Sequence, residues 1–120
     1  MEIKMTPDHI ATARAYYTAM GEKNLEDLDK FLHTNVQFTT PFGQMTGKES
    51  VLGAAKGFFG LFKKLTIGDV FGMGNKVMLT YDLELLPPLG SLSAAVHMTF
   101  QDDGLISKIH LFYDARPFNQ

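Results

Sequence analysis

Apolar residues recur with two different periods in the middle of the chain. From Asn35 to Thr40 every second residue suits a buried face, as in a half-buried strand, and Pro41 ends this strand because proline cannot donate to a neighbouring strand. A helix is predicted next, where Thr46 and Glu49 fit a capping box. Its apolar face comprises Val51, Ala55, Phe58 and Phe62. This strand, turn and helix are predicted to form one wall of an apolar pocket.

Two helices are predicted before this unit. The first begins with Thr6 as its N-cap and Pro7 as its first residue, and Gly21 ends it. Asn24 caps a second, shorter helix. The apolar faces of the two helices comprise Ile10, Ala13, Tyr16, Tyr17 and Met20, and then Leu25, Leu28, Phe31 and Leu32.

Glycines interrupt the predicted third helix. Gly53, Gly57 and Gly60 lie on one stripe, and each costs about 1 kcal/mol relative to alanine in a helix interior. This pattern indicates that something approaches the helix backbone closely. Packing on a sheet is the usual reason, and contact with a ligand is the alternative.

After Lys64 the pattern has a period of two and keeps it to the end of the chain. Strands are predicted at residues 65–71, 76–86, 91–101 and 105–114, with turns rich in glycine, proline and aspartate between them. In the last three strands one face is apolar and the other is mostly polar. This is typical of an antiparallel meander that helices cover on one side only. We therefore predict a single α+β domain over residues 1–120.

The composition argues against several classes of partner. A net charge of -2, from 11 basic and 13 acidic residues, predicts no binding to nucleic acid. No apolar run reaches the roughly 18 residues of a membrane span, so no membrane contact is expected. The chain has no cysteine, which leaves neither a disulfide nor a thiolate metal site. Because no signal peptide follows Met1, the expected location is cytoplasmic.

The order of these elements resembles the nuclear transport factor 2-like superfamily, as do the stretches TTPFG, TGKES and FQDDGLISKIHLFYD. Within it the sequence is most similar to the SnoaL-like and ketosteroid-isomerase-like branch, from Pro7 to Asp114. The resemblance implies a cone in which a curved antiparallel sheet wraps about three N-terminal helices and leaves a deep apolar cavity. It also implies a homodimer through the outer face of the sheet. Because the superfamily includes isomerases, cyclases, dehydratases, hydrolases and binding modules, the fold alone does not give an activity.

Ketosteroid isomerase chemistry needs a carboxylate base and two hydrogen-bond donors to the dienolate oxygen. By the resemblance, Tyr16 matches one donor. Thr40 stands at the position of the base, and Val96, before His97, stands at the position of the second donor. A threonine hydroxyl is no general base near neutral pH, so we expect no ketosteroid isomerase activity by this mechanism.

The predicted cavity combines an apolar lining with a few hydroxyl groups, which suits a small hydrophobic molecule with one or two polar groups. The candidate ligand-binding residues are Phe38, Thr40, Phe58, Phe62, Tyr81, Leu83, Val96, Met98, Ile109, Leu111 and Tyr113. Any single tyrosine could instead be a core residue with a satisfied hydroxyl. We expect no cofactor and no metal.

The hydrophobic cavity allows two main functions. The first is a ligand-binding protein, because no carboxylate stands at the matched base position. The alternative is a SnoaL-like isomerase, polyketide cyclase or dehydratase acting on a small carbonyl compound. In such an enzyme, Tyr16 would donate a hydrogen bond to an enolate oxygen, and Asp114 or a bound water would be the base. A solvated carboxylate at a strand end is the more common reason for such an aspartate. A protein-interaction module is a third hypothesis, which no surface cluster supports.

Two histidines are predicted to face each other across the last hairpin. A two-residue turn at Asp103-Gly104 places His97 opposite His110 on the polar face. Asp82 or Glu84, one strand away, could complete a metal site of two histidines and one carboxylate. An ordinary polar cross-strand pair is the simpler interpretation.

Overall fold

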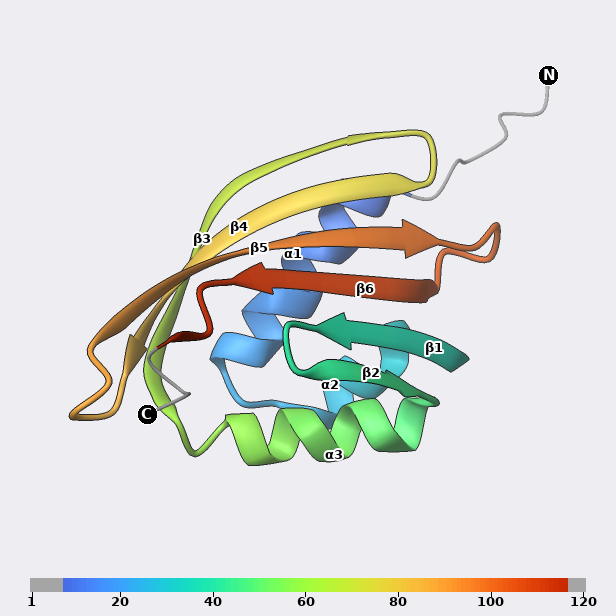
Figure 1. Cartoon of the computed structure of the whole chain (residues 1–120). Helices are drawn as coiled ribbons and strands as arrows, with labels where there is room; N and C mark the ends of the chain where they lie inside the picture. The colour runs from blue at the N-terminus through green and yellow to red at the C-terminus, as the bar shows by residue number, and fades with distance from the viewer. Residues whose placement is uncertain (1–7, 117–120) are drawn as a thin grey trace, which may run out of the picture.

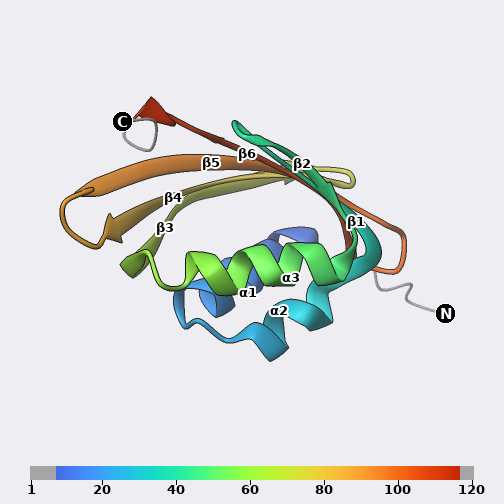
Figure 2. The ribbon, with the colours of Figure 1, turned by 60° about the horizontal axis from the view of Figure 1, so that its bottom comes forward.

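The computed structural model describes residues 8–116, in which a strongly curved, unclosed sheet lies over three helices (Figures 1 and 2). The helices are α1 (His9–Gly21), α2 (Leu25–Phe31) and α3 (Lys48–Phe58). The strands are β1 (Leu32–Thr40), β2 (Gly43–Thr46), β3 (Phe62–Met73), β4 (Lys76–Leu85), β5 (Ser91–Phe100) and β6 (Ile106–Tyr113). Their order in the sheet is β2-β1-β6-β5-β4-β3. The α+β fold is as predicted. Among the helices within residues 8–116, none has the length and hydrophobicity of a membrane span.

The sheet is mixed rather than wholly antiparallel. Strands β3 to β6 form the predicted meander, but β1 pairs in parallel with β6, with Phe38 opposite Ile109. The unpredicted strand β2 turns back on β1, so that Thr39 lies opposite Gln44. Its four residues are too few to show a period, and no local pattern reveals which distant strand β1 will join.

Two of the predicted helix starts need correction. α1 is capped by Asp8, whose side-chain oxygen accepts a hydrogen bond from the amide of Ala11 at 3.0 Å. The predicted cap Thr6 and Pro7 lie outside the described residues. The capping box of Thr46 and Glu49 is wrong, because Thr46 is the last residue of β2 and the N-cap of α3 is Gly47, without a side-chain hydrogen bond. Gly47 has a φ of 103°, a conformation that favours glycine.

The remaining caps and glycines give mixed results. Asn24 caps α2 as predicted, and its side chain accepts a hydrogen bond from the amide of Asp27 at 3.2 Å.

The prediction that another group approaches the backbone of α3 closely at its glycines is wrong. Gly53 and Gly57 are exposed, and a Cβ added at either would meet nothing within 4 Å, while Gly60 lies beyond the helix.

His97 does lie opposite His110, although the turn differs from the predicted one. The amide of Gln101 donates to the carbonyl of Leu105 at 2.9 Å, so residues 102–104 form the turn. An irregularity between Thr99 and Phe100 then restores the expected register.

The alternative of a metal site at this histidine pair is wrong. On β4, Met78 lies opposite His97. Asp82 lies opposite Ser93 instead, and its carboxylate accepts a hydrogen bond from the Ser93 hydroxyl at 2.6 Å. Glu84 lies opposite Ser91, which is further along the strand from His97 than Ser93 is. Both carboxylates of β4 are therefore displaced from the two histidines. No group of three metal-ligating side chains occurs within residues 8–116.

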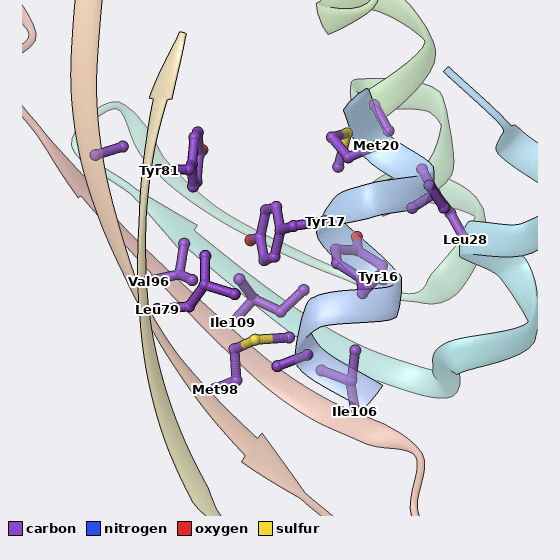
Figure 3. Close-up of a cluster of buried hydrophobic side chains, with 14 of the residues drawn as sticks. Tyr16, Tyr17, Met20, Leu28, Leu79, Tyr81, Val96, Met98, Ile106 and Ile109 are labelled. Carbon is purple, nitrogen blue, oxygen red and sulfur yellow. The ribbon is translucent and has the colours of Figure 1, made fainter. Parts of the chain in front are cut away.

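The inner face of the sheet carries the core. Figure 3 shows side chains of β4, β5 and β6 facing α1. Leu79, Val96, Met98 and Ile106 are fully buried on this face, and Leu28 of α2 is fully buried opposite them. They pack into one continuous hydrophobic cluster, which holds α1 and α2 against the sheet.

Candidate functional site

A cavity of about 330 Å³ opens between α1, α3 and the inner face of the sheet. Small-molecule sites typically measure about 300–1,000 Å³, so the cavity is at the small end of that range. Several of its walls come from residues that the sequence pointed to. The candidate residues that line it are Tyr16, Phe38, Thr40, Phe58, Tyr81, Leu83, Ile109, Leu111 and Tyr113.

Phe62, Val96 and Met98 do not line the cavity. Val96 and Met98 are on the inner face, as expected, but they are fully buried in the packed core. Phe62 begins β3 instead of continuing α3, and the ammonium of Lys23 lies 4.8 Å from the centre of its ring. Alternation along a strand predicts which face of the sheet a side chain lies on. It does not predict whether that side chain packs in the core or lines the cavity.

Several residues that line the cavity were not among the candidates expected from the sequence: Tyr17, Met20, Phe42, Met45, Val51, Ala54, Ala55, Leu61 and Leu92. Some of these were already on predicted apolar faces, so a signal existed. Phe42 and Leu61 gave none, because they lie in connections without a period. Phe42 is 58% exposed and Leu61 44% exposed, which places both at the rim of the cavity.

Buried tyrosines supply most of the polar groups of the cavity. The rings of Tyr17 and Tyr81 stack with centres 5.1 Å apart, and Tyr16 meets Tyr17 edge-on at 5.0 Å (Figure 3). Burial raises the pKa of each of these phenols, and the neighbouring phenols add a smaller effect of the same sign. All three therefore remain protonated at neutral pH and can donate hydrogen bonds.

The hydroxyls of Tyr16, Tyr17 and Tyr81 make no hydrogen bond to another described residue, and none of their oxygens is among the fully buried polar atoms that lack a partner. The only side-chain nitrogen or oxygen that is both sealed and unpartnered within residues 8–116 is Nε2 of His9. All three residues line the cavity. They are not satisfied core tyrosines, which was the alternative interpretation.

Thr40 lines the cavity, but its hydroxyl is used in the turn between β1 and β2. Its Oγ1 accepts from the amide of Phe42 at 3.1 Å and lies 3.5 Å from the carbonyl oxygen of Gly43, to which it donates. Thr40 thus contributes its methyl group to the lining more readily than a directional hydrogen bond.

Asp114 is not among the residues that line the cavity. Nε of Arg116 donates to both oxygens of its carboxylate at 2.9 Å. This side-chain hydrogen bond from Arg116 lowers the pKa of Asp114 to about 2. A carboxylate with so low a pKa is a weak base, and the structure does not bring it together with Tyr16 in the cavity.

Known proteins share this fold and, in part, this sequence. The family model of the SnoaL-like domain matches residues 13–109. No curated protein sequence matches the chain. A solved structure from Kribbella flavida DSM 17836 is similar with a TM-score of 0.85 and 24% identity, over 92% of this chain and 90% of the other.

Two further solved structures are similar over most of their length. An NTF2-like protein of unknown function from Cytophaga hutchinsonii ATCC 33406 has a TM-score of 0.82 and 23% identity, over 98% of this chain and 100% of the other. A candidate ketosteroid isomerase from Kribbella flavida DSM 17836 has a TM-score of 0.81 and 21% identity, over 91% of this chain and 79% of the other. At such identities the likeness concerns the fold alone. Because the family model covers most of the sequence, the chain belongs to the family of SnoaL-like domains.

Proposed function

We propose that this protein binds a small, uncharged hydrophobic molecule in the cavity. The observation that supports this is the chemistry of the lining. Among the described residues that form it there is no aspartate, glutamate, histidine, lysine or arginine. A charged ligand group would lose its water there without gaining an ionic partner, which is strongly unfavourable. An uncharged molecule loses little water and gains apolar contact.

Binding is better supported than catalysis. An isomerase, cyclase or dehydratase of the expected kind needs a base in contact with its substrate. Asp114, the candidate base, is paired with Arg116 and does not line the cavity. The buried phenols are donors at neutral pH, and their raised pKa values make them poor sources of a phenolate base.

The proposed function includes a homodimer through the outer face of the sheet. Phe112 is 47% exposed on that face and stacks on His110. The lysines at positions 76 and 108 lie towards one end of the face, and Asp82 and Glu84 lie towards the other. A two-fold axis between them brings opposite charges together, which favours pairing with a second copy. We expect Phe112→Glu to be monomeric in size-exclusion chromatography with light scattering.

Thermal unfolding with added ligand tests the proposal. A ligand at 100 times its dissociation constant adds about 2.7 kcal/mol to the free energy of unfolding, which raises the midpoint visibly. Suitable probes are 2,3-dimethyl-1,4-naphthoquinone, which is uncharged, and decanoate, which is charged. The chain has no cysteine with which a quinone could react. We expect the quinone to raise the midpoint and decanoate to have no effect.

A variant that fills the cavity supplies the control. Ala54 lines the cavity, whereas Ala11 is exposed on α1. Ala54→Leu should lose the increase in midpoint caused by the quinone, and Ala11→Leu should keep it. The proposal is wrong if no uncharged probe raises the midpoint of the wild type, or if Ala54→Leu responds as the wild type does.

A further inference from the structure

Tyr17 and Tyr81 meet inside the cavity from opposite walls. Tyr17 belongs to α1 and Tyr81 to β4, and their stacked rings have an interplanar angle of 26°. Figure 3 shows the ring of Tyr17 extending from the helix toward the sheet, with its hydroxyl on the sheet side. Both residues line the cavity and are at most 4% exposed. Two stacked phenol rings, whose hydroxyls no other described residue uses, therefore lie in the cavity.

Tyr16 occupies a different position, although the resemblance to isomerases pointed to it. Its ring meets Tyr17 and Phe31 edge-on, with its centre 6.4 Å from that of Phe31. In Figure 3 its hydroxyl points along the helix toward Met20, and not toward the sheet. Its hydroxyl is therefore directed away from the space that Tyr17 faces.

The other polar groups of the lining do not replace this pair. The hydroxyl of Thr40 is used in the turn, as described above. The ring of Tyr113 lies nearer the rim, with its centre 6.3 Å from that of the exposed Phe42. The hydrogen bonds available to a ligand in the interior of the cavity therefore come first from Tyr17 and Tyr81.

We propose that Tyr17 and Tyr81 form a two-donor site that selects an uncharged carbonyl or quinone ligand, with Tyr17 rather than Tyr16 as the main donor from α1. The inference rests on the proposed function. Each hydroxyl donates one hydrogen bond to a carbonyl oxygen, and no covalent step is involved. A hydrocarbon of the same shape leaves both hydroxyls without a partner in a space from which it has displaced water, so the site discriminates against it.

A matched pair of ligands and a matched set of variants test this. The ligands are 2,3-dimethyl-1,4-naphthoquinone and 2,3-dimethylnaphthalene, and dissociation constants are measured by equilibrium dialysis. The variants Tyr16→Phe, Tyr17→Phe and Tyr81→Phe each remove one hydroxyl and keep the ring. We expect Tyr17→Phe and Tyr81→Phe each to weaken quinone binding about fivefold, the typical effect of one hydrogen bond, without weakening hydrocarbon binding. Tyr16→Phe should change quinone binding less than about twofold.

The outcomes separate this inference from the proposed function. If the wild type binds the hydrocarbon as well as the quinone, and the tyrosine variants bind both alike, the two-donor site is wrong and the binding function stands. If Tyr16→Phe has the largest effect, the assignment to Tyr17 is wrong. If the wild type binds neither ligand, both proposals fail. Thermal midpoints without ligand verify that each variant is folded, and either Tyr17→Phe or Tyr81→Phe suffices to decide.

Discussion

The inner face of the sheet is filled at one end and hollow at the other. Leu79, Met98 and Ile106 at the filled end are fully buried, whereas Leu111 and Tyr113 at the hollow end are only partly buried. All of these residues follow the same alternation along their strands. The difference comes from what lies opposite them. The wall of the cavity formed by α3 includes the small side chains of residues 54 and 55, which leave space unfilled.

The largest expected effect is a contrast between the two ends. Met98→Ala should lower the free energy of unfolding by about 2–5 kcal/mol, because it creates a void in close-packed surroundings. Leu111→Ala should cost clearly less, since Leu111 already borders open space. Urea denaturation measures both. Equal losses would show that the hollow end is packed as tightly as the filled end.

The tyrosines between the two ends should make the protein sensitive to alkali. Burial raises their pKa values above the ordinary value of 10.0, so the folded state prefers the protonated phenols. This preference is fully present below pH 10 and is lost as the pH rises through the raised values, by about 1.4 kcal/mol for each pH unit that separates the raised pKa from the ordinary one. We expect the free energy of unfolding to fall as the pH rises above 10. It should fall less in Tyr81→Phe, and an identical decline in both proteins would contradict this account.

The exposed glycines of α3 and its N-cap give a smaller contrast. Gly53 and Gly57 face solvent, with space for a Cβ, so Gly53→Ala and Gly57→Ala should each stabilise the protein by about 0.5–1 kcal/mol. Gly47 also has space for a Cβ, but its φ of 103° is unfavourable for alanine. Gly47→Ala should therefore destabilise the protein by about 1 kcal/mol or more. Thermal unfolding separates the two outcomes. If the alanines in α3 destabilise the protein or alter quinone binding, a contact at this surface has been missed.

The smallest expected effect concerns Asp114, which lies outside the cavity. Hydrogen bonds from Arg116 lower its pKa to about 2, so this pairing favours the folded state above the ordinary value of 3.8 and is lost as the pH falls toward 2. NMR titration of the carboxyl should show the low pKa in the wild type and a value nearer 3.8 in Arg116→Ala. Asp114→Asn should leave quinone binding unchanged. A large change in binding would place Asp114 at the site after all.

The sequence was sufficient for the faces of the elements. Alternation predicted which side of each of the last three strands is buried, and helical spacing placed Tyr16, Tyr17 and Met20 on the inner side of α1. Such patterns are local, since they depend only on the repeat of the backbone. The family resemblance also came from the order of the elements, and the family model over residues 13–109 confirms it.

The tertiary structure alone decided how these faces meet. The parallel pairing of β1 with β6, the return of β2 and the rim position of Phe42 depend on residues far apart in the chain. The same is true of the cavity, because its volume is the difference between the space inside the curved sheet and the side chains that enter it. Periodicity therefore placed Val96 and Leu111 on one inner face, but only the packing of α1 and α3 against the sheet decided that Val96 fills the core and Leu111 lines the cavity.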